Sequence, residues 1–133
     1  MIHLKEQQEQ ELVIGWARSL EPRYPKLSRL HCSLNGVWLP KKLAMQAKDG
    51  GMVSGVPDLH LPVPMKVGEI MFHGLWIEMK SMEGVLSKNQ KLWLAELNDD
   101  GYAAVCCKGA KAAIRVIANY MNIKQEDRKL EWL

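Results

Sequence analysis

The chain has little of what marks a membrane, secreted or repetitive protein. No stretch approaches the roughly 20 apolar residues that cross a bilayer, and the acidic, glutamine-rich beginning lacks the apolar region of a signal peptide. Neither a low-complexity segment nor an internal repeat is visible. We therefore expect a cytoplasmic protein.

Cysteine is also scarce. There are three, Cys32 and the neighbours Cys106 and Cys107, and no two have the CxxC spacing of a redox or zinc site. Adjacent residues of a strand point to opposite faces, so Cys106 and Cys107 are predicted to be buried thiols in two different layers. This pattern favours a reducing compartment.

Charge of either sign is moderate. The 133 residues are 47% hydrophobic and 25% charged, which is typical of a globular protein and excludes extensive disorder. The length suits one domain over residues 1–133. The net charge of +3 is compatible with a nucleic-acid partner, but many ordinary enzymes are equally basic.

The hydrophobic periodicity predicts an α/β fold, a mixed central sheet flanked by helices in the order α-β-α-β-β-α-β-α. Pro40 and Ser87 are good helix starts, and Asn35-Gly36 is a turn signal. The last two strands should be parallel, with a right-handed crossover between them. The expected helices are 4–20, 41–48, 88–98 and 110–121, and the expected strands are 27–34, 56–63, 71–79 and 102–107.

Two short segments carry the clearest chemistry, Pro57-Asp58 and Glu78-Met79-Lys80. Alternate strand residues share a face, so Glu78 and Lys80 point one way and Met79 the other. If the two predicted strands pair, Asp58 converges with Glu78. Two carboxylates and the Met79 carbonyl would offer oxygen ligands to Mg²⁺, and Lys80 would orient a water or stabilise transition-state charge.

Spacing alone leaves a simpler interpretation open. Glu78 and Lys80 would then be an exposed pair on an amphipathic strand, and Pro57-Asp58 only a turn. The surrounding residues Leu75, Trp76 and Ile77 argue against this, because adjacent charges in so apolar a strand need a partner or a ligand.

Further segments accompany these two in a fixed order. They are Asn35-Gly36, Gly55-Val56-Pro57-Asp58-Leu59, Ile77-Glu78-Met79-Lys80, Leu86-Ser87-Lys88-Asn89-Gln90-Lys91-Leu92-Trp93, Gly101-Tyr102 and a Glu/Gln pair in the first helix. Together they resemble the VRR-NUC family, the virus-type replication and repair branch of the PD-(D/E)xK nucleases. The resemblance implies a restriction-endonuclease-like core and covers most of the chain.

The resemblance also implies roles for individual residues. Asp58 and Glu78 would be the metal-binding carboxylates, Lys80 the catalytic lysine, and Gln90 a glutamine beside the site. The family has a glutamate on the first helix. Counting back from Trp16 matches it best to Glu6, and Glu9 is the second choice.

Other residues near the presumed site have two interpretations. Ser87, Lys88 and Lys91 are candidate phosphate contacts, or a helix cap and two solvated lysines. His60 shares a strand face with Asp58 but is more typical of a structural histidine. Trp93 suits helix packing better than base stacking.

The expected activity is therefore metal-dependent cleavage of DNA with Mg²⁺ or Mn²⁺. The resemblance implies a bacterial or phage protein that acts as a homodimer on Holliday junctions or other branched DNA. A sequence-specific restriction-type endonuclease and a non-catalytic DNA-binding module of the same fold are the alternatives.

Overall fold

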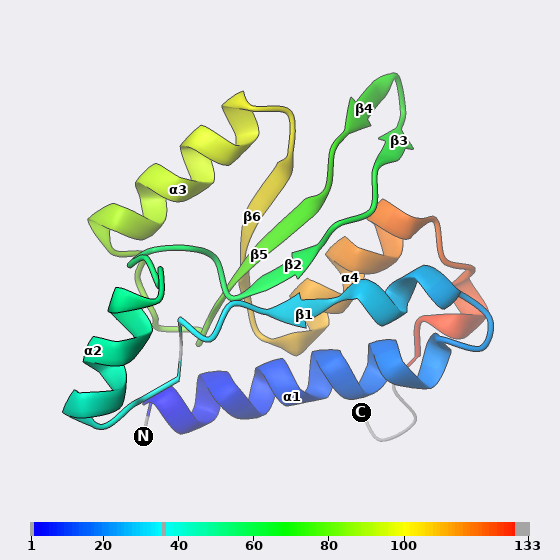
Figure 1. Cartoon of the computed structure of the whole chain (residues 1–133). Helices are drawn as coiled ribbons and strands as arrows, with labels where there is room; N and C mark the ends of the chain where they lie inside the picture. Colours follow the sequence, from blue (N-terminus) through cyan, green and yellow to red (C-terminus); the bar gives the residue numbers. More distant parts are fainter. Residues whose placement is uncertain (1, 36, 130–133) are drawn as a thin grey trace.

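A mixed sheet of four strands forms the centre of the molecule (Figure 1). The computed structural model describes residues 2–35 and 37–129. β1 pairs with β2 and β2 with β5 in antiparallel fashion, whereas β5 and β6 are parallel, as predicted. The strands in sheet order are β1 (His31–Cys32), β2 (Leu59–Leu61), β5 (Leu75–Lys80) and β6 (Ala103–Lys108).

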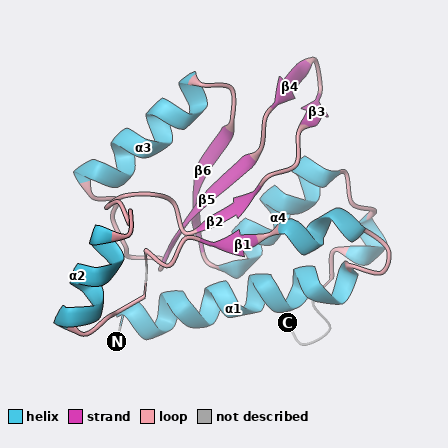
Figure 2. Ribbon diagram, viewed as in Figure 1, coloured by secondary structure: helices cyan, strands magenta, loops and turns pink. Residues whose placement is uncertain are grey.

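Helices cover both faces of this sheet (Figure 2). α1 (Ile2–Leu20) and α4 (Ala110–Met121) pack against each other on one face, and α3 (Lys88–Asp99) packs over β6 on the other. The short helix α2 (Lys41–Asp49) has no buried residue and lies to one side. Among the helices of the described residues, none combines the length and apolarity needed to cross a membrane.

Strand alternation divides the core into two layers. Leu75, Ile77 and Met79 of β5 point into the larger core beneath α1 and α4, and each is only 1% exposed. Trp76 points to the opposite face, into the smaller cluster beneath α3. Cys106 and Cys107 point to opposite faces, as predicted. Cys107 is buried in the larger core, whereas Cys106, expected to be buried, is only partly so.

The first predicted strand, residues 27–34, is mostly wrong. Pro25–Arg29 forms a 3₁₀ helix, η1, and only the two residues of β1 pair with the sheet. The reason is Arg18, whose guanidinium donates hydrogen bonds to the carbonyls of Leu27, Ser28 and Leu30 at 3.2, 3.3 and 2.7 Å. The guanidinium therefore takes the place of a strand partner for these carbonyls.

The predicted turn at Asn35-Gly36 lies partly outside the described residues, because Gly36 is not among them. On either side of it, the Val37 N–H donates to the Leu34 carbonyl at 3.1 Å. Leu34 has a φ of 68°, in the left-handed region that side chains rarely adopt. The chain thus reverses here, directly before α2.

The predicted strand 71–79 is two strands. β4 (Ile70–Phe72) pairs with β3 (Met65–Val67) in a separate hairpin, and β5 starts at Leu75. β3 lies between the expected strands 56–63 and 71–79, where no strand was predicted. Between β4 and β5, the backbone bonds to a different segment: the His73 N–H donates to the Gly101 carbonyl, and the Gly74 carbonyl accepts from the Ala103 N–H. The chain changes partner at this point.

Two smaller expectations also change. The strand 56–63 contracts to β2, since Pro57 and Pro62 cannot donate to a ladder. The apolar face that helix periodicity predicts for residues 88–98 includes Leu92, but Leu92 is 55% exposed, and Leu94 and Leu97 make the contact with the sheet.

Candidate active site

The antiparallel pairing of β2 with β5 brings the two carboxylates together. Leu59 lies opposite Ile77, so Asp58 and Glu78 are neighbours at the same end of the strand pair. The Met79 N–H donates to Asp58 Oδ2 at 2.8 Å, which fixes this carboxyl group against β5. Asp58 is 8% exposed and Glu78 only 3%.

A cavity of about 260 Å³ opens over these carboxylates. The sequence predicted six of its lining residues as site residues, and the fold brings these six together from four separate segments. They are Glu6, Asp58, Glu78, Lys80, Ser87 and Gln90.

Gln90 connects the helix start to the buried glutamate. Its Oε1 accepts from the Ser87 N–H at 2.9 Å and its backbone N–H donates to Ser87 Oγ at 3.2 Å, which is a capping box at the start of α3. Its Nε2 donates to Glu78 Oε2 at 3.2 Å. One side chain thus caps α3 and orients Glu78.

The two candidate glutamates of α1 lie in different places. Glu6 lines the cavity, and its Oε1 accepts from the Ser81 N–H at 3.4 Å. Glu9 instead accepts from the Ala110 N–H at the start of α4, where a helix N-terminus favours negative charge. Of the two, Glu6 faces the carboxylate pair.

The carboxylate pair is electrostatically strained. Burial raises the pKa of Glu78 to about 9, and the neighbouring carboxylate of Asp58 adds to the shift. Burial also raises the pKa of Asp58, opposed by its hydrogen bonds with Glu78 and the Met79 N–H and by the charge of Lys80. Without a cation, the pair therefore retains a proton at neutral pH.

A divalent cation fits this donor set. Among the described residues, no donor group reaches the buried Glu78 Oε1 when both carboxylates are ionised, which is an unfavourable state for a carboxyl oxygen. Mg²⁺ commonly binds through one or two carboxylates and keeps several waters. Within residues 6–35 and 37–129, whose side chains the structure describes, no cluster of three or more His, Cys, Asp or Glu side chains is arranged around a common ion position, so waters would complete the coordination.

Other predicted residues lie outside the cavity lining. Lys88 and Lys91 are exposed on the first turns of α3. His60 stacks on Trp76, with ring centroids 3.7 Å apart, and Trp93 packs in the small cluster beneath α3. The Met79 side chain is buried as expected, and a ligand role for its carbonyl stays a prediction.

No pattern in the sequence indicated which residues form the rim of the cavity. Trp38 and Val37 line it and are 79% and 42% exposed. Ser54 and Gly55 also line it. These residues come from irregular segments, where no periodicity shows which way a side chain faces.

The loop before Asp58 docks on the start of α3 through Gly55. A Cβ on Gly55 would lie 2.8 Å from the backbone carbon of Asn89, and its φ of +94° strains any other residue. The Asn89 side chain also donates to Ser54 Oγ at 3.4 Å. This contact sets where the chain enters β2, and so where Asp58 lies.

We expect Gly55→Ala to lower the free energy of unfolding by about 3 kcal/mol, because left-handed strain and a backbone clash add together. Two glycines provide matched controls. Gly51→Ala, with a φ of +106° and open space around it, should cost only the strain of about 1 kcal/mol. Gly15→Ala, exposed in α1, should stabilise by about 0.8 kcal/mol. Urea unfolding measures all three, and equal effects of the Gly55 and Gly51 variants would contradict the docking contact.

A proline-aspartate segment and a glutamate-x-lysine segment on paired strands, at one cavity, are the pattern after which the PD-(D/E)xK nucleases are named. The chain belongs to the VRR-NUC family, since the family model described as "VRR-NUC domain" matches residues 1–111. Membership implies a nuclease with DNA as its substrate, and nucleases of this family are typically metal-dependent.

A solved structure supports this assignment. The chain is similar to one titled "VRR_NUC domain protein", with a TM-score of 0.68 and 26% sequence identity over 90% of each chain. No curated protein matches the sequence significantly.

Proposed function

We propose that this protein is a Mg²⁺- or Mn²⁺-dependent DNA endonuclease whose active site is the cavity over Asp58 and Glu78. The observation that supports this most is the buried carboxylate pair, with an unpartnered oxygen on Glu78 and with Lys80 lining the same cavity. A buried pair of this kind costs stability unless a cation or a proton compensates it. Its presence is explained by metal binding.

Each residue has a separate role in this proposal. Asp58 and Glu78 bind the cation, which supplies Lewis-acid chemistry to the scissile phosphate and the attacking water. Lys80 orients that water and offsets charge in the transition state. Gln90 keeps the carboxyl group of Glu78 turned toward the cavity, and Glu6 adds a polar side chain from α1.

We further propose a homodimer that acts on branched DNA. Six large apolar side chains between residues 34 and 53 are 42–79% exposed, namely Leu34, Val37, Trp38, Leu43, Met45 and Val53. An exposed apolar group of this size is typical of a protein interface. A second copy bound at this surface would place two catalytic cavities against two DNA strands, which suits a branched DNA junction.

The test is cleavage of a four-way junction with Mn²⁺ or Mg²⁺, compared with linear duplex of the same sequence. We expect cutting of the junction at least tenfold faster than of the duplex, and none when EDTA is present. Equal cutting of one specific duplex sequence would favour the restriction-type alternative. Binding without cutting of any DNA by dimeric protein would favour the non-catalytic module.

A further inference from the structure

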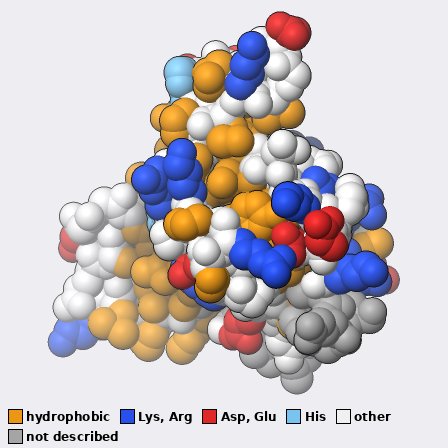
Figure 3. Space-filling model, turned by 90° about the vertical axis from the view of Figure 1, so that its right-hand side faces the viewer, with side chains coloured by type: hydrophobic (Ala, Val, Ile, Leu, Met, Phe, Trp, Pro, Cys, Tyr) orange, Lys and Arg blue, Asp and Glu red, His pale blue; other side chains and the backbone are white. Residues whose placement is uncertain are grey.

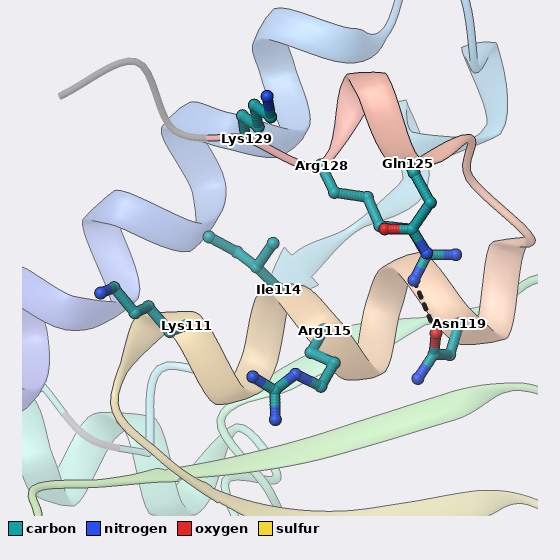
Figure 4. A pocket seen from close by; sticks show the side chains of 7 residues that line it. All are labelled: Lys111, Ile114, Arg115, Asn119, Gln125, Arg128 and Lys129. Carbon is teal, nitrogen blue, oxygen red and sulfur yellow. Dashed lines mark hydrogen bonds between the residues drawn. The ribbon is translucent and has the colours of Figure 1, made fainter. Parts of the chain in front are cut away.

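A second and larger cavity, of about 550 Å³, lies along the outer side of α4 (Figure 4). It is bounded by α4 and by the segment around η2 (Gln125–Asp127). Lys111, Arg115, Arg128 and Lys129 contribute four cations to it, and no carboxylate is among its lining residues in the described part of the chain. Figure 3 shows Lys and Arg side chains, with a few Asp and Glu, gathered on this side of the molecule.

Arg128 forms a fixed wall of this cavity. Its guanidinium donates to the Ile123 carbonyl at 2.8 Å, to Asn119 Oδ1 at 2.7 Å and to the Ala118 carbonyl at 3.4 Å (Figure 4). These acceptors belong to the last turn of α4 and to the second residue after it. Arg128 thus ties η2 to α4 and keeps its charge at the cavity.

Lys111 and Arg115 are the available cations. They lie four residues apart on α4, so they share one face of the helix and both are exposed. In the part of the chain that the structure describes, neither forms an ion pair. Lys111 and Arg115 are solvated, and Arg128 beside them is held in place by its hydrogen bonds. These three cations make a surface that attracts an extended polyanion.

A backbone hydrogen bond links the start of α4 to the strand that carries Lys80. The Gly109 N–H donates to the Lys80 carbonyl at 3.0 Å, and α4 starts at the next residue. With a rise of about 1.5 Å per residue, Lys111 and Arg115 are separated by about 6 Å along the helix axis. One DNA strand carries a phosphate about every 3.4 Å along its axis, so this distance covers about two phosphates.

We propose that this cleft binds consecutive backbone phosphates of a DNA arm that lies outside the catalytic cavity. The proposal rests on the proposed nuclease function and adds a second, non-catalytic contact with the substrate. Phosphate contacts of this kind position a nucleic acid without reading its sequence. Such a contact suits a substrate recognised by its shape.

The test is binding of a fluorescent four-way junction by the full-length Asp58→Asn protein, which keeps the DNA intact. We expect adding Lys111→Ala and Arg115→Ala to weaken binding about tenfold and to reduce the salt slope by about two, since two phosphate contacts are lost. Lys26→Ala with Lys66→Ala, two exposed lysines outside both cavities, removes the same charge and should have less than a threefold effect.

Equal affinities and salt slopes for the two double variants would overturn the proposal. A second result would also overturn the proposal: tripolyphosphate inhibits junction binding by the parent but not by the Lys111/Arg115 variant, while both proteins bind the junction with the same affinity. The cleft would then bind only small anions. The nuclease function is judged separately, from cutting by the unmodified protein. If the unmodified protein cuts no DNA but the Lys111/Arg115 variant binds the junction tenfold more weakly, the nuclease function is rejected and the DNA-binding role of the cleft is retained.

Discussion

Glu78→Gln is expected to reduce DNA cleavage about 1,000-fold and yet to make the metal-free protein more stable at pH 8. The loss of activity follows from removing a charged metal ligand. The gain in stability follows from burial, because an amide of the same shape is already neutral and avoids the cost of protonating Glu78 on folding at pH 8. Gln90 and Asp58 still have a hydrogen-bond partner at this position.

The pH dependence has a defined sign. The pKa of Glu78 is raised from 4.5 to about 9 in the folded protein, so the folded state binds more protons than the unfolded state between these values. Stability is therefore full below about pH 4.5 and is lost as the pH rises toward 9. At pH 8 this cost of protonation is expected to lower the melting temperature of the metal-free protein by about 10 °C.

Thermal unfolding in EDTA at pH 5.5 and pH 8.5 measures this effect. The fall in melting temperature between the two pH values should be larger for the unmodified protein than for Glu78→Gln. Mn²⁺ should restore the unmodified protein at pH 8.5 and have little effect on the variant. A Glu78→Gln protein that is less stable than its parent at pH 8.5 in EDTA would contradict the strained pair.

Lys80→Ala should reduce cleavage by about 100- to 1,000-fold while leaving metal binding intact or tighter. The ammonium group offsets transition-state charge, and a single group of this kind is worth two to three orders of magnitude. It also repels a cation held by Asp58 and Glu78, so its removal favours the metal. Loss of cleavage would then be separate from loss of metal.

Lys108→Ala is the matched control. Lys108 lies opposite Lys80 in the parallel pairing of β5 with β6, and its side chain is exposed. We expect its cleavage rate to stay within a few-fold of the parent. Cleavage and the Mn²⁺-induced rise in melting temperature are measured on both variants. If Lys80→Ala cuts at the parent's rate, Lys80 is not the catalytic lysine.

The sequence predicted most where local rules decide the structure. Strand alternation alone placed Glu78 and Lys80 on one face and Met79 on the other, and helix periodicity predicted α1, α3 and α4 to within a few residues. The parallel pairing of β5 and β6 followed from the helix between them.

The features that could not be predicted from the sequence depend on contacts between residues far apart in the chain. Residues 27–30 are not a strand because a guanidinium nine to twelve positions earlier binds their carbonyls. Glu6 and Glu9 lie less than one helical turn apart, so their own segment cannot distinguish them. The start of α4, about a hundred residues later, draws Glu9 away from the cavity.

The shared role of Gln90 has a consequence for how the site forms. Its amide group completes the first turn of α3 and contacts Glu78 at the same time, so unwinding of that turn would also release the buried glutamate. Helix ends normally fray independently of the rest of a protein. Here fraying would leave a second carboxyl oxygen of Glu78 without its donor, so we expect the candidate site and the helix start to open and close as one cooperative unit.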